Sequence, residues 1–243
     1  MFKISFIELS QLKIINNIDF SIQDGEICYV LGPNGSGKST LAKTIMGFPD
    51  FAIDKGTIVL DDVELKDMDI SQRSILGVFL AFQNPVEIPG VNYRNFLRLA
   101  YNLRQKKEDM LSPMAFGQIL KNKSEIFGIQ NELLEKNLNE NLSGGEKKKL
   151  EILQMAILEP RIVILDEIDS GLDFDATKAV YQGLQTIKHK CPNMMFLIIT
   201  HSFEPFKYLD PSKILIMKKG TVVKSGGKEL LDDIKSSGFE SLE

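Results

Sequence analysis

Short apolar runs separated by polar turns dominate the first third of the chain. MFKISFIELS at residues 1–10 alternates apolar and polar positions, whereas ICYVL at residues 27–31 is apolar throughout. Alternation predicts a strand with one buried face, and a short, wholly apolar run between turns predicts a strand buried on both faces. We expect a turn at residues 23–26 and further strands within residues 56–82, with a polar link at residues 66–73.

The pattern becomes helical from residue 92 to about residue 158. NYRNFLRLAYNLR and MAFGQILKNKSEIF carry apolar residues at three- and four-residue intervals. RIVIL at residues 161–165 and MMFLII at residues 194–199 again have strand length, and a helix is expected from Phe174 between them. Residues 213–224 predict a short β ending. Strands that alternate with helices and have no polar side indicate an α/β fold, a parallel sheet covered on both faces.

Composition excludes some classes of function. Among 243 residues the net charge is −4, so nothing indicates a nucleic-acid partner. No apolar run approaches the 18 or so residues that cross a bilayer, so direct membrane insertion is not expected. Cys28 and Cys191 are isolated, which favours free thiols in a reducing compartment. The expected location is cytoplasmic, and a plastid stroma fits equally.

A glycine-rich segment, GPNGSGKST, joins a predicted strand to a predicted helix and fits the pattern G-x-x-x-x-G-K-[ST]. Glycines let backbone amides curl around phosphate oxygens, and the helix N-terminus adds partial positive charge. The lysine would reach the β- and γ-phosphates and the following serine would ligate Mg²⁺. A plain glycine-rich turn is the alternative, which this context disfavours. The predicted nucleotide-binding residues are Gly32, Pro33, Asn34, Gly35, Ser36, Gly37, Lys38, Ser39 and Thr40.

Two adjacent carboxylates follow the four apolar residues at 162–165. Ligands bind at the C-terminal ends of strands in open α/β sheets. Asp166 can hold Mg²⁺ through water, and Glu167 can face the γ-phosphate and polarise the attacking water. Two solvated carboxylates at a strand end are the alternative, which the phosphate loop weakens.

A second anion site is predicted at LSGGE, residues 142–146, where a new helix begins. Ser143 supplies a side-chain donor, and Gly144 and Gly145 let a phosphate approach the unpaired amides of the helix start. An ordinary N-cap at Ser143 is the alternative. One triphosphate is already served by the phosphate loop, so this second site needs an explanation.

These motifs, with a glutamine after a strand and a later Thr200-His201, resemble ABC-type ATPases in order and spacing along nearly the whole chain. The resemblance implies ATP and Mg²⁺ as ligands. It also implies a P-loop ABC-type nucleotide-binding domain: a parallel core sheet, an N-terminal antiparallel β subdomain and a helical subdomain. Residues 1–243 would form one domain. Residues 1–85 and 159–243 would form the catalytic α/β core with the β subdomain, and residues 86–158 the helical signature subdomain.

The resemblance also assigns roles. In this family two ATPase domains pair head to tail, and the signature serine and glycines of one grip the γ-phosphate bound by the other, which implies an ATP-dependent homodimer. Asp169 and Asp173 match the loop that crosses that interface, although a turn or helix-cap carboxylate is the alternative for Asp169. The implied catalytic residues are Glu167, His201, Gln83 and Lys38, and the implied metal ligands are Ser39, Gln83 and Asp166.

The stretch AFQNPVEIPGV at residues 81–91 is apolar and stiffened by two prolines. Gln83 matches the family glutamine that senses Mg²⁺ and the attacking water, at the junction with the helical subdomain. In family members the loop beyond it docks on the partner that uses the mechanical work. VEIPGVNYRNF at residues 86–96 is therefore expected to touch a partner, and a packed core loop is the alternative.

Longer strings resemble the SufC subfamily, the ATPases of SUF iron–sulfur cluster assembly: FQNPVEIPGVNYRNFLRLAYNLR, SGGEKKKLEILQMAILEP, LDEIDSGLD and VKSGGKEL. The resemblance implies SufB- and SufD-like scaffold partners that carry the cluster. Asn84, Leu142, Lys149 and Leu150 depart from the usual pattern, and residues 10–13 offer no aromatic to stack on adenine. Two other functions stay open: the ATPase subunit of an ABC membrane transporter, and a non-catalytic nucleotide-gated adaptor.

Overall fold

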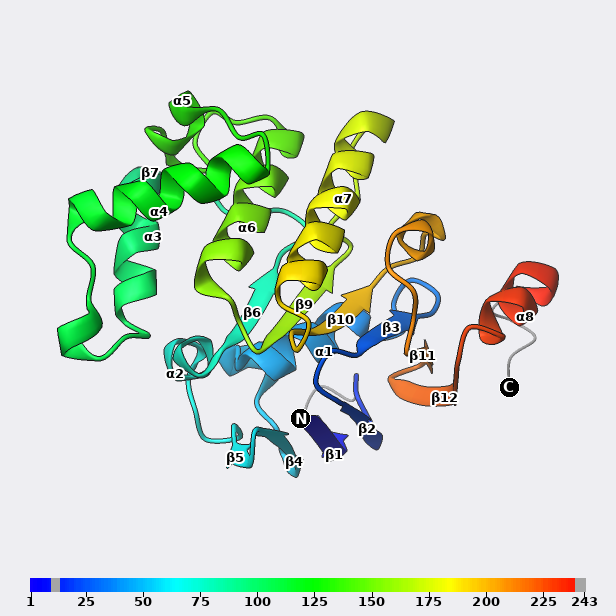
Figure 1. The fold of residues 1–243 in the computed structure, drawn as a ribbon. Coiled ribbons are helices and arrows are strands. Elements are labelled where there is room, and N and C mark those ends of the chain that lie inside the picture. The colour runs from blue at the N-terminus through cyan, green and yellow to red at the C-terminus, as the bar shows by residue number, and fades with distance from the viewer. Residues whose placement is uncertain (10–13, 239–243) are drawn as a thin grey trace. The chain divides into compact units, whose positions relative to one another are not determined.

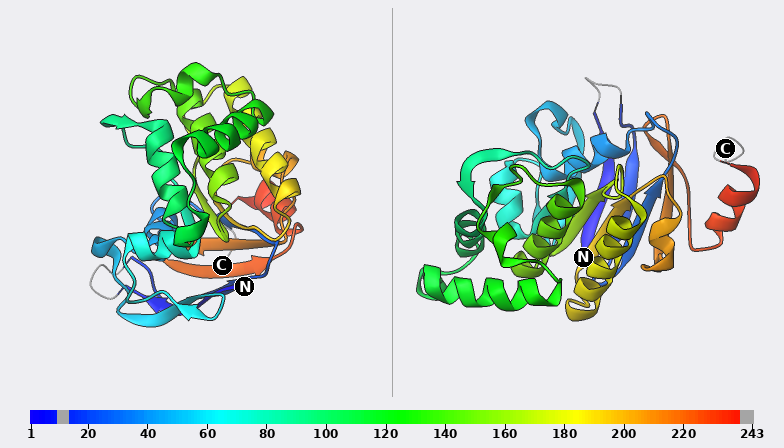
Figure 2. Two further views of the ribbon diagram at one scale, coloured as in Figure 1. Left: turned by 60° about the vertical axis from the view of Figure 1, so that its left-hand side comes forward. Right: turned by 90° about the horizontal axis from the view of Figure 1, so that it is seen from above.

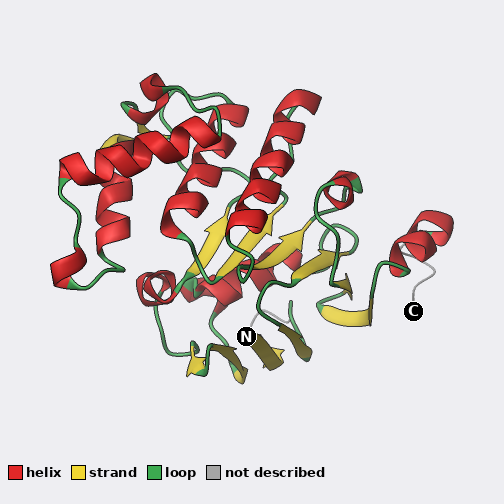
Figure 3. Cartoon of the chain, in the orientation of Figure 1, coloured by secondary structure: helices red, strands yellow, loops and turns green. Residues whose placement is uncertain are grey.

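The computed structural model describes residues 1–9 and 14–238, and Figures 1 and 3 show its elements. By their contacts the residues form two compact units. The core unit comprises Met1–Leu80, Arg161–Glu167 and Pro192–Glu243, and the helical unit comprises Ala81–Pro160 and Ile168–Cys191. The sequence-based subdomain boundaries at residues 86 and 158 stay a prediction.

The strands of the core unit form two sheets in the part of the chain that is described. A six-stranded sheet has the order β12-β11-β3-β10-β9-β6, in which β9, β10, β3 and β11 pair in parallel. A four-stranded antiparallel sheet has the order β2-β1-β4-β5. The bounds are β1 Phe2–Glu8, β2 Ile18–Ile22, β3 Ile27–Leu31, β4 Lys55–Leu60, β5 Val63–Glu64, β6 Val78–Ala81, β9 Ile162–Asp166, β10 Met195–Ile199, β11 Lys213–Lys218 and β12 Thr221–Gly226.

Burial follows the apolar pattern of the sequence. Every residue of β3, β9 and β10 is buried, as expected of parallel strands covered on both faces. In β2 buried positions alternate with more exposed ones, as in a sheet with one face on the core. The two sheets meet where β12 contacts β2 (Figure 2). The predicted α/β class, with a parallel core sheet and an antiparallel β part, is confirmed.

The core unit also holds helices α1 (Lys38–Met46), α2 (Ile70–Leu76) and α8 (Leu230–Ser237), with 3₁₀ turns η1 (Pro49–Phe51) and η3 (Glu204–Lys207). Helix α1 packs against β9. Helix α2 begins inside the predicted polar link, because Asp69 and Gln72 form a capping box that starts a helix there. Helix α8 was not predicted. It is short, and the buried side chains described in it are Leu230, Leu231 and Ile234.

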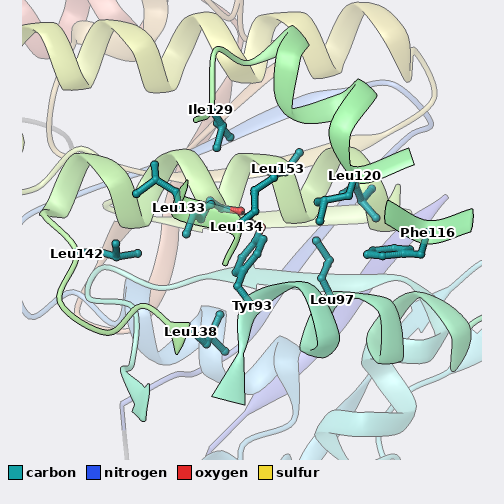
Figure 4. Close-up of a cluster of buried hydrophobic side chains, with 12 residues drawn as sticks. Tyr93, Leu97, Phe116, Leu120, Ile129, Leu133, Leu134, Leu138, Leu142 and Leu153 are labelled. Carbon is teal, nitrogen blue, oxygen red and sulfur yellow. Dashed lines mark hydrogen bonds between the residues drawn. The ribbon is translucent and has the colours of Figure 1, made fainter. Parts of the chain in front are cut away.

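The helical unit contains α3 (Tyr93–Asn102), α4 (Pro113–Ile126), α5 (Asn131–Leu134), α6 (Gly144–Leu158), α7 (Phe174–Lys190) and the 3₁₀ turn η2 (Lys107–Asp109). Strands β7 (Ile88–Asn92) and β8 (Asn137–Leu138) form a small antiparallel ribbon. Side chains of α3, α4 and α6 meet in one buried cluster, where Figure 4 shows Tyr93, Leu97, Phe116 and Leu153 side by side. The Tyr93 hydroxyl donates to the carbonyl of Leu150 at 2.9 Å. The apolar residues that recur at helical intervals in the sequence thus form the core of the helical unit.

Arg73 on α2 holds the C-terminal end of α1. Its guanidinium is buried and donates to the carbonyls of Thr44 and Ile45 at 2.8 and 2.9 Å, and also to those of Met68 and Lys66. The last carbonyls of a helix have no partner within the helix, and Arg73 supplies one to Ile45. At Thr44 it adds to the bond that the carbonyl accepts from the N–H of Gly47.

We expect Arg73→Met to lower the free energy of unfolding by about 3 kcal/mol, because several buried carbonyls lose their donor. Chemical denaturation followed by circular dichroism measures the change. Lys66→Met in the same segment removes only a long, 3.3 Å bond to the carbonyl of Asp54 and serves as the control. Equal stability of the two variants would contradict this role of Arg73.

Candidate functional site

Three neighbouring strands of the core unit end at one edge of the sheet. β3 leads into the glycine-rich loop, β9 ends at Asp166, and β10 leads into Thr200 and His201. Ile199 pairs with Asp166 on one side and with Val30 on the other, so the three strand ends are level. This edge, at the C-terminal ends of parallel strands, is where ligands bind in open α/β sheets.

The glycine-rich loop needs its glycines at two positions above all. Gly32 has φ +153°, and a Cβ there would lie 2.1 Å from the carbonyl oxygen of Met217. Gly37 has φ +101° and immediately precedes α1, without a side-chain cap on the first amides of that helix. The loop can therefore curl tightly and present backbone N–H groups to an anion.

Lys38 lies back across this loop. Its ammonium donates to the carbonyls of Gly32 and Pro33 at 2.9 and 3.0 Å. Burial lowers the pKa of Lys38, and the nearby carboxylates of Glu167 and Asp166 oppose that effect. The structure thus places one positive charge against the loop, with two carboxylates close by.

Ser39 and Asp166 are hydrogen-bonded, with the hydroxyl donating to Oδ1 at 3.1 Å. Burial raises the pKa of Asp166, and the bond from Ser39 counteracts the rise. A hydroxyl and a carboxylate side by side offer the oxygen ligands that Mg²⁺ prefers. This pair fits a magnesium site.

Glu167 and His201 face each other, with 3.5 Å between Oε1 and Nδ1. The backbone of Glu167 is left-handed, with φ +48°, and its N–H donates to the carbonyl of Ile199 at 3.0 Å. A non-glycine residue in this region carries strain and is held there by its surroundings. Thr200 holds the backbone on both sides of His201, because its hydroxyl accepts from the N–H of Ser202 at 2.9 Å.

A pocket of about 490 Å³ opens between these groups, lined by Ile14, Asn34, Gly35, Gly37, Lys38, Ser39, Thr40 and Glu167. The hydroxyl of Ser36 in the same loop is buried and has no hydrogen-bond partner among the described residues. The glycine-rich loop, Lys38 and the Ser39–Asp166 pair together fit a nucleoside triphosphate with Mg²⁺.

In the helical unit, Ser143 is the N-cap of α6. Its hydroxyl accepts from the N–H of Glu146 at 3.3 Å, while the Glu146 carboxylate accepts from the N–H of Ser143 at 2.8 Å. The bond from the Ser143 N–H, together with a hydrogen bond from the Ser143 side chain, lowers the pKa of the Glu146 carboxyl group. The N-cap expected as the alternative is therefore present, and it orders the segment without covering the glycines that follow.

Gly144 and Gly145 adjoin the segment before α7. A Cβ at Gly144 would lie 3.3 Å from Leu172, and one at Gly145 would lie 3.3 Å from Ala176. A hollow of about 410 Å³ is lined by Ser143, Gly144, Gly145, Glu146, Lys149, Gly171, Leu172, Asp173, Asp175, Ala176 and Ala179. The signature segment and residues 171–173 thus form one concave surface of the helical unit.

The remaining predicted residues lie nearby in the same unit. The Asp173 carboxylate is the N-cap of α7 and accepts from the N–H of Ala176 at 2.7 Å. The backbone carbonyl of Asp169 accepts from the N–H of Leu172 at 3.3 Å. Gln83 donates to the hydroxyl of Ser170 at 3.3 Å. The glutamine loop therefore contacts the segment that carries Asp169 and Asp173.

The predicted residues thus fall into two groups, one in each unit. Sequence reasoning missed a buried ion pair on α6, Lys148 with Glu151. A signal was present, since Glu151 stands inside the apolar run LEIL. The expectation about adenine stacking concerns residues 10–13, which lie outside the described residues.

Comparison with known proteins gives consistent matches. A family model described as ABC transporter matches residues 15–170. A protein of Synechocystis sp. named probable ATP-dependent transporter is 43% identical over 95% of this chain and 90% of its own length. Vegetative protein 296 of Bacillus subtilis is 42% identical over 96% of this chain and 89% of its own length. The relative named probable ATP-dependent transporter ycf16 in Trieres chinensis is 40% identical over 96% of this chain and 93% of its own length.

Solved structures match in fold. The dimeric post-hydrolysis ATP-binding cassette MJ0796, bound to ADP and Pi, has a TM-score of 0.76 at 18% identity and covers 93% of this chain and 98% of its own. A nucleotide-free ATP-binding cassette from an ABC transporter has a TM-score of 0.77 at 22% identity, covering 98% and 95%. Within the described ranges, no helix has both the length and the apolar character to span a membrane.

Proposed function

This chain belongs to the ABC transporter family and is an ATP hydrolase that uses ATP and Mg²⁺, and on that basis we propose that it is the ATPase of SUF-type iron–sulfur cluster assembly. The observation that carries the proposal is the match of long strings, in residues 82–104 and 143–160 above all, to the SufC subfamily. These strings extend well beyond the residues that ATP binding requires.

The roles that we propose follow from the geometry of the core unit. Lys38 lies against the loop that would cradle the phosphates, where its charge can bind the β- and γ-phosphates. Glu167 is the general base that takes a proton from the attacking water, and His201, 3.5 Å from it, binds the γ-phosphate. Ser39 and Asp166 would hold Mg²⁺, which would offset phosphate charge when bound, and the family resemblance adds Gln83 as a further ligand.

The second anion site leads us to propose an ATP-dependent, head-to-tail homodimer. The hollow at Ser143, Gly144 and Gly145 would bind the γ-phosphate of a nucleotide carried by the other chain, and Asp169 and Asp173 would lie at that interface. Gly144 and Gly145 line the hollow in the first turn of α6, where helix amides have no partner within the helix and suit an anion. ATP binding would bring two chains together, and hydrolysis would release them.

The partners that we propose are SufB- and SufD-like scaffold proteins, which would contact the loop after Gln83. Val86 and Ile88 are 65% and 40% exposed, which favours a partner contact over a packed core loop at these positions, whereas Tyr93 in the same stretch is buried. Cys28 is buried and Cys191 is distant in sequence, whereas clusters are held by several thiolates at defined spacings. The cluster would therefore form on the partner, in the cytoplasm or a plastid stroma.

A second candidate is the ATPase subunit of an ABC membrane transporter. The names of several relatives favour it, since they are called probable ATP-dependent transporters. In that case the loop after Gln83 would dock on a membrane permease. A non-catalytic nucleotide-gated adaptor is disfavoured, because Lys38, Asp166 and Glu167 are all present in a hydrolytic arrangement.

A pull-down with tagged Glu167→Gln protein and Mg-ATP tests the proposal, with co-purified proteins identified by mass spectrometry. We expect SufB- and SufD-like proteins, and no iron in the chain purified alone. The same pull-down with Lys38→Ala, which is not expected to hold ATP, identifies contacts that do not depend on nucleotide. Recovery of a membrane permease would overturn cluster assembly in favour of transport.

A further inference from the structure

A buried ion pair on α6, Lys148 with Glu151, is hydrogen-bonded to Phe82, the residue that precedes Gln83. Lys148 is 3% exposed and Glu151 is 6% exposed, and 2.8 Å separates Nζ from Oε2. Both side chains also bind the backbone of Phe82. The Lys148 ammonium donates to the Phe82 carbonyl, and the Phe82 N–H donates to the Glu151 carboxylate. One peptide segment is thus held by both charges at once.

Stability does not explain this pair. Removing two charges from water costs several kcal/mol per ion, and apolar side chains of similar volume often give an equally or more stable protein. Burial raises the pKa of Glu151, while Lys148 and the Phe82 N–H oppose the rise. What the charges supply, and apolar side chains would not, is a fixed position for the backbone of Phe82.

Two more bonds join the same segments. Asn139 donates to the carbonyl of Val86 at 2.8 Å, and Lys147 pairs with Glu87 at 2.6 Å. The loop 82–87 is therefore attached at both of its ends to residues 139–151. Gln83 lies within the attached loop, and the signature serine and glycines lie within the segment that holds it.

We propose that Lys148 and Glu151 are positioning residues for Gln83, which tie the glutamine to the signature helix so that the two move together. The inference rests on the proposed role of Gln83 toward Mg²⁺. A partner that shifts the exposed part of the loop would then shift Ser143 and its glycines as well.

The test replaces both charges by apolar side chains in the full chain, Lys148→Met with Glu151→Met. The fold is expected to survive, because no charge is left unpaired, while the unfolding midpoint falls, because the Phe82 N–H and carbonyl lose their side-chain partners; activity is therefore measured well below that midpoint. We expect kcat for ATP to fall about tenfold with KM for ATP changed less than twofold, and the Mg²⁺ concentration for half-maximal turnover to rise severalfold. A merely structural role would not move the Mg²⁺ requirement. The single variant Lys148→Arg keeps hydrogen-bond donors toward Glu151 and the Phe82 carbonyl, so its ATP turnover is expected to be close to that of the wild type.

Lys123→Met is the matched control. Lys123 also binds a carbonyl of α6, that of Ala156 at 2.9 Å, together with the carboxylate of Glu159, but it does not contact the loop 82–87. The Mg²⁺ concentration for half-maximal turnover of the Lys123→Met variant should equal that of the wild type. If the Met–Met variant does not fold, the neutral pair Lys148→Met with Glu151→Gln carries the same measurement.

Gln83→Ala separates failure of the inference from failure of the proposed function. If Gln83→Ala leaves the Mg²⁺ requirement unchanged, the proposed role of Gln83 is wrong. If Gln83→Ala raises it and the Met–Met variant does not, the positioning role of Lys148 and Glu151 is overturned. In the Gln83→Ala background the Met–Met substitution should raise the Mg²⁺ requirement no further, because both act through one group.

Discussion

Glu167→Gln is expected to lower ATP turnover by a factor of about 100 or more while leaving ATP bound. Glutamine has nearly the same shape but cannot accept a proton, and a positioned general base contributes about 10²–10⁴-fold to rate. The backbone turn that carries Glu167 should be unchanged, since its bond to the carbonyl of Ile199 comes from the main chain. Phosphate release measures the loss.

The same variant should accumulate as an ATP-bound dimer, because binding is intact and the step that separates the chains is blocked. Size-exclusion chromatography with light scattering, in the presence and absence of Mg-ATP, detects the dimer. Glu132→Gln, the same chemical change at an exposed residue of α5, should behave as the wild type. Turnover that survives Glu167→Gln would show that another group is the base.

Lys38→Ala should abolish hydrolysis by a different route, through loss of ATP binding. A hydrogen bond to a charged group contributes about 1.5–3 kcal/mol, so the dissociation constant for ATP should rise about tenfold to a hundredfold. Unlike Glu167→Gln, this variant should stay monomeric in Mg-ATP. Titration with a fluorescent ATP analogue measures the affinity.

The exposed Lys55, which pairs only with Glu8 among its described contacts, provides the control as Lys55→Ala. It removes the same charge without touching the phosphate loop, so ATP affinity should not change. If Lys38→Ala bound and hydrolysed ATP within a few fold of the wild type, the assigned phosphate contact would be wrong.

The core-unit half of the candidate site was predictable because its chemistry is local. Gly32 to Thr40 follow a wholly apolar strand and run into the first turn of a helix, and Asp166 ends another buried strand. The carboxyl ends of parallel strands meet at one edge of the sheet, so the sequence predicts that these groups lie together. The Ser39–Asp166 hydrogen bond then follows from the level ends of β3, β10 and β9.

Other features depend on tertiary contacts that no local pattern encodes. Lys148 follows Lys147 in a charged helix start, where charges normally face solvent, and only packing against Phe82 buries it. Helix α2 arose where polar residues had indicated a link, because a capping box and the contacts of Arg73 outweigh its weak apolar pattern. Asp173 was expected at a nucleotide interface, and in the described structure its carboxylate already caps α7.

The way in which the loop 82–87 is attached bears on how such a protein could acquire new partners. At Phe82 and Val86 the bonds run to main-chain carbonyls, which every amino acid possesses. The outward side chains at Val86 and Ile88 can therefore be exchanged while these anchors stay the same. Substitutions in the proposed docking surface at Val86 and Ile88 would leave the residues that bind and hydrolyse ATP unchanged. The same ATPase domain could therefore bind different partner proteins through changes at a few exposed positions.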